Sequence, residues 1–263
     1  MATITAALID IDGVLTVSWR ALPGAAEAMV RLRKMGLGLR LVTNTTSRTR
    51  SWMATRLSAQ GFPVHPDDLL TAPGLTAQYL TEHHPGARCL VLNSGDLSND
   101  LPGVDLVGAD ADGVDVVVLG GAGPEFDYHA LNRVFTHLRR GAALVAMNRN
   151  LYWATDDGLR LDTGTFLAGL ELASGVTATM TGKPAASFFS SALERLGATP
   201  GEALVVGDDL DSDVVAGQAA GLHGALVRTG KFLPGDLTRS AVAPDHVVDS
   251  FTDVPDLIER LNS

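Results

Sequence analysis

Short runs of consecutive hydrophobic residues alternate along the chain with stretches that repeat a hydrophobic position about every three to four residues. The runs predict buried strands at residues 6–9, 37–42, 89–92, 114–119, 143–147, 178–180, 203–206 and 224–227. The periodic stretches predict helices at residues 24–35, 47–60, 75–82, 128–140, 165–173 and 254–261, and after residues 184 and 213. Strands that are hydrophobic throughout are typical of parallel sheets covered by helices, which bind ligands beyond the carboxyl ends of their strands. The pattern therefore predicts an α/β fold.

Composition and charge narrow the class of protein. The 263 residues allow one large domain or two smaller ones, and 46% hydrophobic with 19% charged residues is typical of a globular protein. A net charge of −10, without a basic patch, argues against nucleic acid as a partner. The sequence has no run of about 18 apolar residues, so no membrane association is expected. The single cysteine, Cys89, cannot form an internal disulfide, and we expect a cytoplasmic protein.

Two acidic residues end the first predicted strand. Asp10 and Asp12 are separated by one residue, and alternate side chains of an extended segment project to the same face. Like charges held close together are costly unless a cation or a shared proton relieves their repulsion. The pair therefore favours a Mg²⁺ site, although an acidic strand end on the surface explains this motif alone about equally well.

Small polar residues follow the second strand, directly before a predicted helix. Thr43 and Asn44 begin this segment, and two further threonines continue it. A helix start of this kind has unpaired backbone N–H groups that suit a phosphate dianion. Arg48 and Arg50 lie in the next turns, and we interpret them as solvated side chains.

A lysine lies in the segment Thr-Gly-Lys-Pro, between a short predicted strand and a helix. A lone lysine is usually only solvated. The glycine and proline beside Lys183 fix a tight connection, however, so its ammonium can be held over the ends of the strands. We therefore favour a binding role for Lys183.

Four acidic residues follow the strand at residues 203–206, within the segment Gly-Asp-Asp-Leu-Asp-Ser-Asp. Such a cluster of oxygen ligands suits a hard divalent cation, and Mg²⁺ typically takes only one or two carboxylates while it keeps several waters. The remaining acids are expected to orient the ligands or to stabilise the start of the following helix.

Taken together, the segments LIDIDGVL, LVTNTTS, TGKP and VVGDDLDSD resemble the motifs of the haloacid dehalogenase-like (HAD) hydrolase superfamily, in the same order. The likeness is greatest to subfamily IIA, which includes nitrophenylphosphatase-like enzymes, pyridoxal phosphate phosphatase and phospholysine phosphohistidine inorganic pyrophosphate phosphatase. The tail VRTGKFLPGD is similar to the last of these enzymes. The resemblance covers nearly the whole chain and implies a Rossmann-like core with a parallel sheet and an inserted α/β cap domain.

The resemblance implies a Mg²⁺-dependent phosphatase that hydrolyses small-molecule phosphate monoesters through an aspartyl phosphate, with phosphoamides and pyrophosphate left open as further substrates. Asp10 would be the nucleophile and Asp12 the general acid and base. Thr43 and Asn44 would bind the phosphoryl group, and Lys183 would neutralise its charge. The metal would be held by the Asp10 carboxylate, the Asp12 backbone carbonyl and Asp208, with Asp209 and Asp213 binding it through water or orienting the lysine.

By the same resemblance, residues 1–84 and 179–263 form the catalytic core and residues 85–178 form the cap. The cap loop after the strand at residues 143–147 offers the specificity candidates Asn148, Asn150, Tyr152 and Trp153. Asn150 replaces the aspartate that is usual there, so the substrate of a relative does not transfer to this chain by analogy. A simpler alternative is that Tyr152 and Trp153 pack inside the cap.

The expected partners are a small phosphorylated metabolite and a second copy of the chain, because relatives form dimers through the cap. Two other classes of function stay open. A phosphomutase would return the phosphoryl group to the substrate instead of releasing it. A phosphate-accepting signalling or binding module would store the phosphoryl group without turnover, and storage needs no acid/base group such as Asp12.

Overall fold

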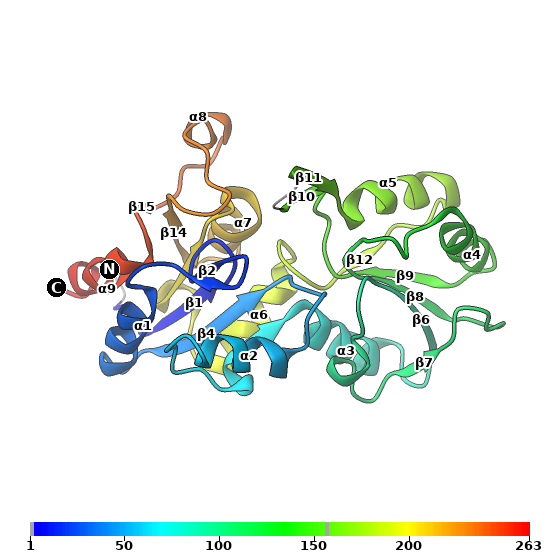
Figure 1. The fold of residues 1–263 in the computed structure, drawn as a ribbon, viewed down its shortest axis with the longest axis horizontal. Helices are drawn as coiled ribbons and strands as arrows, with labels where there is room; N and C mark the ends of the chain where they lie inside the picture. Colours follow the sequence, from blue (N-terminus) through cyan, green and yellow to red (C-terminus); the bar gives the residue numbers. More distant parts are fainter. Residues whose placement is uncertain (1–2, 156–157) are drawn as a thin grey trace. The chain divides into compact units, whose positions relative to one another are not determined.

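The computed structural model describes residues 3–155 and 158–263 (Figure 1). By their internal contacts the residues form two compact units. The first unit comprises Met1–Thr43, Arg50–Leu70 and Lys183–Ser263, and the second comprises Asn44–Thr49 and Thr71–Gly182. Each unit contains a parallel sheet with helices, which confirms the α/β fold class predicted from the hydrophobic pattern.

The first unit is built on a sheet with the strand order β15-β14-β13-β1-β4-β5. Its strands are β1 (Ala6–Asp10), β4 (Gly38–Thr43), β5 (Leu69–Thr71), β13 (Ala203–Gly207), β14 (His223–Val227) and β15 (His246–Val248). Strand β1 pairs in parallel with β13 on one side and β4 on the other, and all of its residues are buried. This central position explains why the first strand is hydrophobic up to its final aspartate.

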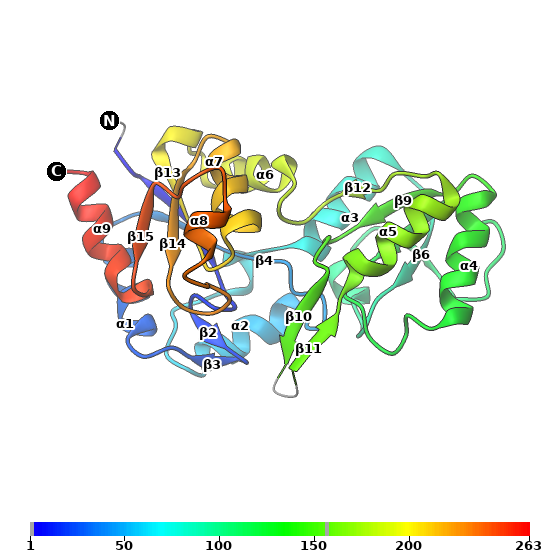
Figure 2. The same cartoon turned by 90° about the horizontal axis from the view of Figure 1, so that it is seen from above.

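Helices cover both faces of this sheet. They are α1 (Ala25–Lys34), α2 (Arg50–Ser58), α6 (Ala186–Leu196), α7 (Ala216–Ala219) and α9 (Val254–Leu261). The short helix α8 (Asp236–Arg239) lies in the connection between β14 and β15. Met29 of α1, Leu57 of α2 and Ile258 of α9 share one core cluster with the strands. Helices α6 and α7 lie on the opposite side of the sheet from α1 and α2 (Figure 2). A small antiparallel ribbon, β2 (Thr16–Val17) and β3 (Arg20–Ala21), follows β1.

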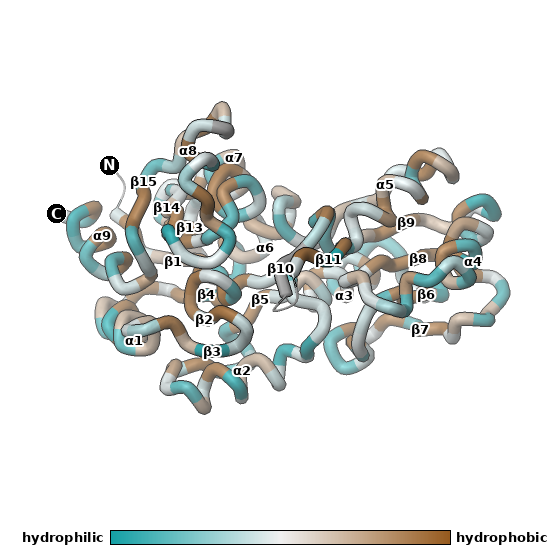
Figure 3. The backbone as a smooth tube through the Cα atoms, turned by 45° about the horizontal axis from the view of Figure 1, so that its top comes forward, coloured by the Kyte–Doolittle hydropathy of each residue, from teal (hydrophilic) through white to brown (hydrophobic). Residues whose placement is uncertain are grey.

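The second unit has its own sheet, with the strand order β12-β9-β8-β6-β7 and parallel pairing throughout. The strands are β6 (Arg88–Leu92), β7 (Asp105–Val107), β8 (Val116–Leu119), β9 (Ala143–Ala146) and β12 (Thr179–Met180). Helices α4 (Tyr128–Arg139) and α5 (Thr163–Ser174) bury their apolar residues in a cluster on one face of this sheet. Helix α4 alternates between hydrophobic and hydrophilic residues, as a helix with one buried face does (Figure 3).

Helix α3 (Ala72–His83) shifts the boundary between the units relative to the sequence prediction. The cap was expected to begin at residue 85, whereas the second unit begins at Thr71. The reason is packing, because Ala77 and Leu80 of α3 share a core cluster with Cys89 and Val118 of the second sheet. The unit also ends at Gly182 rather than at residue 178.

A short early segment also belongs to the second unit. Residues 44–49 leave the first unit after β4 and contact the second sheet's loops. The Thr46 hydroxyl accepts a hydrogen bond from the Gly121 N–H at 2.8 Å, and the Asn93 side-chain amide donates to the Thr46 carbonyl at 3.1 Å. Linear patterning did not predict this assignment, since the two partners are far apart in the sequence.

A hairpin replaces part of a predicted loop. Strands β10 (Tyr152–Thr155) and β11 (Gly158–Leu161) pair antiparallel, and the sequence analysis had assigned the first two residues of β10 to a loop. The helix expected after residue 213 begins earlier, as a π-helical turn at Leu210–Val215. None of the helices in the described part of the chain has both the length and the apolar character that crossing a bilayer requires.

Candidate functional site

The polar segments predicted to carry chemistry lie at the carboxyl ends of neighbouring strands in the first unit. Asp10 ends β1 and pairs in register with Val42, so that Thr43 follows directly at the end of β4. On the other side of β1, Ile9 pairs with Val206, and Asp208 comes just after the end of β13. Since parallel strands end at one edge of a sheet, Asp10, Thr43 and Asp208 gather at that edge.

Lys183 brings a buried positive charge to this edge. Its Nζ lies 2.5 Å from Oδ1 of Asp10 and 2.6 Å from Oδ1 of Asp213. Only 4% of the Lys183 side chain is exposed. Although burial alone would lower the pKa of Lys183, the two carboxylates raise it, so the ammonium stays charged. The geometry holds this cation in one place between two anions, as the sequence analysis expected of the Gly-Lys-Pro connection.

Three buried carboxylates cluster around the lysine. Asp10, Asp208 and Asp213 each offer an oxygen, and these oxygens lie within 4.8 Å of one another. Burial, followed by repulsion from Asp10 and Asp213, raises the pKa of Asp208 to about 8. Burial also raises the pKa of Asp213 to about 6 and that of Asp10 above its ordinary value, against the opposing charge of Lys183. Oxygen ligands whose repulsion a cation would relieve fit Mg²⁺ in both chemistry and charge.

Asp12 differs from these acids because its side chain is exposed. Partial loss of hydration still raises the pKa of Asp12, and the charge of Lys231 together with a hydrogen bond from the Ser18 backbone opposes the rise. The segment is held by the turn that follows, where the Gly13 N–H donates to the Thr16 carbonyl at 2.6 Å. An accessible carboxyl group with a raised pKa is suited to exchanging a proton with a ligand.

Asp209 and Asp213 take different partners. Asp213 contacts Lys183, whereas Asp209 pairs with Lys231, whose Nζ lies 3.3 Å from Asp209 Oδ2. The other oxygen of Asp209 accepts backbone hydrogen bonds from Asp211 and Ser212, at 3.2 and 3.1 Å, at the start of the π-helical turn. The turn thus directs one acid toward the buried lysine and fixes the other at the rim. Turns of this type frequently occur at functional sites.

A further lysine at this edge was missed by the sequence reasoning. Lys231 lies in the loop after β14, and its backbone N–H donates to Oδ2 of Asp208 at 2.7 Å. The sequence contains a signal for this second lysine, because Thr-Gly-Lys occurs twice, at residues 181–183 and 229–231, each time soon after a strand. Only the first copy was assigned a role.

Gly13 leaves room for Asp208. Its φ is +90°, and a Cβ built there would lie 1.9 Å from Asp208 Oδ2. Gly13→Ala is therefore expected to displace Asp208 and to lower activity at least about tenfold, in addition to a backbone cost of about 1 kcal/mol or more. Gly36→Ala is the matched control, because Gly36 has φ +77° and a Cβ there would meet nothing within 4 Å. Equal activity of the two variants, measured beside their thermal unfolding, would contradict the expectation.

Thr43 and Asn44 lie on either side of a unit boundary. Thr43 is buried at the end of β4 in the first unit, and Asn44 is the first residue of the segment assigned to the second. Their role in binding a phosphoryl group stays a prediction.

The specificity candidates all lie in the second unit. Asn148 is buried, and its side-chain oxygen accepts a hydrogen bond from the Asn150 N–H at 3.0 Å. Between them, Arg149 forms two 2.8 Å hydrogen bonds with Glu171 of α5, which anchors this loop. Tyr152 is 60% exposed, so the alternative that it packs inside the cap is wrong. The Trp153 side chain lies outside the described part of the structure, and a specificity role for these residues stays a prediction.

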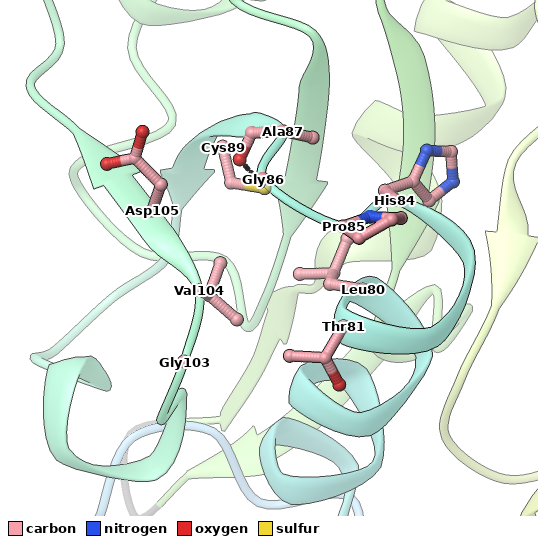
Figure 4. Close-up of a pocket in the computed structure, with 10 residues that line it drawn as sticks. All are labelled: Leu80, Thr81, His84, Pro85, Gly86, Ala87, Cys89, Gly103, Val104 and Asp105. Carbon is pink, nitrogen blue, oxygen red and sulfur yellow. Dashed lines mark hydrogen bonds between the residues drawn. The ribbon is translucent and has the colours of Figure 1, made fainter.

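A separate cavity of about 150 Å³ lies in the second unit, beside the end of α3. It is lined mainly by small and apolar residues, among them Leu80, Pro85, Val104 and Cys89 (Figure 4). The Cys89 thiol donates to the Ala87 carbonyl, and burial raises the pKa of Cys89 to about 11. A thiol that keeps its proton at neutral pH is a poor nucleophile, so we assign no chemistry to this cavity.

Comparison with known proteins places these motifs in context. A family model described as haloacid dehalogenase-like hydrolase matches residues 7–107, and one described as HAD-hydrolase-like matches residues 180–254. Phospholysine phosphohistidine inorganic pyrophosphate phosphatase from Xenopus laevis is 35% identical, over 97% of this chain and 94% of that protein.

Solved structures agree with the sequence comparison. The p-nitrophenyl phosphatase from Archaeoglobus fulgidus superimposes with a TM-score of 0.90 at 27% identity, over 97% of this chain and 99% of its own. The glycerol phosphate phosphatase from Mycobacterium tuberculosis, solved in complex with magnesium, has a TM-score of 0.85 at 28% identity, over 97% of this chain and 78% of its own.

Proposed function

This chain belongs to the haloacid dehalogenase-like hydrolases and is a phosphatase of that family, and we propose that it uses Mg²⁺ to hydrolyse small-molecule phosphate monoesters through an aspartyl phosphate. The resemblance drawn from the four sequence motifs is thereby confirmed at the level of the family. The observation that carries the finer proposal is the cluster of Asp10, Asp208 and Asp213 around the buried Lys183.

The first step is attack by an Asp10 carboxylate oxygen on the phosphorus atom of the substrate. A bond forms between that oxygen and phosphorus, and the bond from phosphorus to the leaving-group oxygen breaks. Attack by one anion on another requires that charge be cancelled first. Lys183, held 2.5 Å from Asp10, supplies one positive charge at that point. Thr43 and Asn44 would add hydroxyl, amide and backbone donors to the phosphoryl oxygens.

Asp12 acts as the acid in the first step and as the base in the second step, which removes the phosphoryl group from Asp10. The exposed Asp12 carboxyl, whose pKa is raised, donates its proton to the departing oxygen in the first step. As a carboxylate it then takes a proton from a water molecule, which attacks phosphorus and releases inorganic phosphate. Asp10 is regenerated as a carboxylate and Asp12 as a carboxylic acid.

Mg²⁺ would be held by the Asp10 and Asp208 carboxylates together with the Asp12 backbone carbonyl. When bound, it supplies positive charge that balances the phosphoryl oxygens and relieves the repulsion within the acidic cluster. Asp213 is committed to Lys183 at 2.6 Å, which supports a role in orienting that lysine rather than in binding the metal directly.

Metal dependence provides the test of this proposal. The protein is expected to release phosphate from p-nitrophenyl phosphate in the presence of Mg²⁺ and to lose this activity when the ion is chelated with EDTA. Because binding to the folded state stabilises a protein, added Mg²⁺ should also raise the midpoint of thermal unfolding. Ca²⁺ is a larger ion that accepts more ligands, so it serves as the control for general neutralisation of the acidic cluster by a divalent cation. Full activity in excess EDTA would contradict the proposal.

The same assay separates the alternatives. A phosphomutase would form an isomeric phosphate ester without equivalent release of free phosphate. A storage module would be phosphorylated once and then stop. The presence of Asp12, an accessible acid beside the nucleophile, supports turnover over storage. A panel of phosphorylated metabolites, phosphoamides and pyrophosphate would identify the substrate, and gel filtration would test the predicted homodimer.

A further inference from the structure

The candidate site contains a second lysine whose surroundings differ from those of the first. The chain has three lysines: Lys183 is enclosed at the site, Lys231 lies at its rim, and Lys34 is exposed on α1. Lys183 is only 4% exposed and contacts two carboxylates, whereas 51% of the Lys231 side chain is exposed. The Nζ of Lys231 forms an ion pair with Oδ2 of Asp209 at 3.3 Å. Lys231 can therefore contact a ligand that enters from solvent. Lys183 can contact a ligand only inside the cluster of buried carboxylates.

The loop that carries Lys231 is fixed to the site. The Thr229 hydroxyl donates to the Gly13 carbonyl at 2.5 Å, and the Lys231 N–H donates to Asp208. Gly230, at φ +62°, packs so closely that a Cβ there would lie 2.1 Å from Asp208 Oδ2 and 2.5 Å from the Cα of Gly13. The backbone of Lys231 is thus held against both the first and the last of the acidic segments, while its long side chain extends from a rigid base.

Asp209 has hydrogen-bond partners other than Lys231. Its Oδ1 accepts hydrogen bonds from the backbone of Asp211 and Ser212. If the ammonium turned toward a ligand, Asp209 would keep these partners and one oxygen would face solvent, since 26% of its side chain is exposed. Moving the lysine therefore leaves no buried carboxylate without a partner, and the cost of the movement is small.

We propose that Lys231 binds a negatively charged leaving group and so selects substrates that carry a second anionic group beside the phosphoryl group that is transferred. This inference rests on the proposed function in one respect, the assignment of Asp12 to the leaving-group side. Thr229, two residues before Lys231, donates its hydroxyl hydrogen bond to the carbonyl of Gly13, the residue that follows Asp12, so the loop of Lys231 packs against the segment that carries Asp12. Without a cation at this rim, Asp12 and Asp209 would repel such a leaving group. A neutral aromatic leaving group gains nothing from the lysine's charge.

Binding of two non-hydrolysable ligands tests the proposal without turnover. Methylenediphosphonate carries a second anionic group, whereas phenylphosphonate carries a neutral ring in its place. By calorimetry with Mg²⁺ present, Lys231→Met is expected to weaken methylenediphosphonate about 10- to 100-fold and phenylphosphonate less than about threefold, the range for loss of one charged hydrogen bond. Lys231→Arg should restore most of the difference, and Lys34→Met, the same change on α1, should alter neither ligand.

Steady-state kinetics with hydrolysable substrates provide a second test of the proposal. The value of kcat/KM for pyrophosphate is expected to fall in Lys231→Met by about the same factor as binding, while that for ethyl phosphate, whose leaving group departs as a neutral alcohol, changes little. Equal losses on both ligands, no loss on either, or a wild-type protein that does not bind methylenediphosphonate would each overturn the inference. A protein that hydrolyses nothing would contradict the proposed function instead, and the binding measurement would still decide the role of Lys231.

Discussion

Asp10→Asn is expected to abolish phosphatase activity, by a factor of at least about 10⁴, because an amide oxygen is too weak a nucleophile to form the phosphoryl intermediate. Asparagine has nearly the same shape, and Lys183 keeps Asp213 as its partner at 2.6 Å. The variant should therefore remain folded. Initial rates on p-nitrophenyl phosphate, together with circular dichroism and thermal unfolding, would measure both expectations.

The intermediate itself can be sought in the wild-type protein. Acid quenching during turnover, followed by mass spectrometry, should find one phosphoryl group on the peptide that contains Asp10 and none in the variant. Asp67→Asn is a matched control, since it makes the same change in a side chain that is 79% exposed in the turn before β5. Residual turnover near the wild-type rate in Asp10→Asn would exclude this residue as the nucleophile.

Asp12→Asn is expected to lower kcat by about 10²- to 10⁴-fold, the range for loss of a general acid and base, with little change in KM. The two half-reactions should respond differently on p-nitrophenyl phosphate. The nitrophenolate leaving group hardly needs a proton, so Asp10 can still be phosphorylated, but water is no longer activated to remove the phosphoryl group. Rapid mixing should then show a burst of about one nitrophenolate per site followed by a slow phase.

An alkyl phosphate is the useful comparison for this variant. Its leaving group needs the proton that Asp12 supplies, so the burst should be absent and both steps should be slow. Substitution of Asp67 should leave the time course of both substrates unchanged. If Asp12→Asn lost the burst on both substrates, or turned over at the normal rate, Asp12 would not have the proposed double role.

Much of the fold can be predicted from the sequence because buried strands and helices are recognisable as hydrophobic runs and periodic hydrophobic patterns. The first four of the five buried residues of β1 form a hydrophobic run, and α4 was predicted within one residue of its observed end. The prediction failed where a segment can pack against more than one part of the fold and those parts are distant from it in the sequence. Nothing in the pattern of residues 72–83 says that α3 packs on Cys89 and Val118 rather than on the first sheet. The β10–β11 hairpin was missed because exposed strands such as Gly158–Leu161 lack a buried face.

The candidate site was more predictable than its surroundings. Asp10, Lys183, Asp208 and Asp213 lie in motifs that mark strand ends, and the structure brings these four side chains together. Lys231 was missed for a physical reason, since its role depends on a loop packing against Gly13 and Asp208. That contact joins residues more than two hundred positions apart, and its only local signal is a repeated Thr-Gly-Lys.

The assignment of residues 44–49 to the second unit has a consequence for engineering. Deleting residues 71–182 and joining the flanking ends would not yield a clean minimal enzyme, because Thr46 would lose its hydrogen bonds with Gly121 and Asn93. A chimera that exchanges this module for another must replace two separate stretches of the gene at once. The shorter stretch begins one residue after Thr43, so the graft would replace Asn44, which is predicted to bind the phosphoryl group together with Thr43.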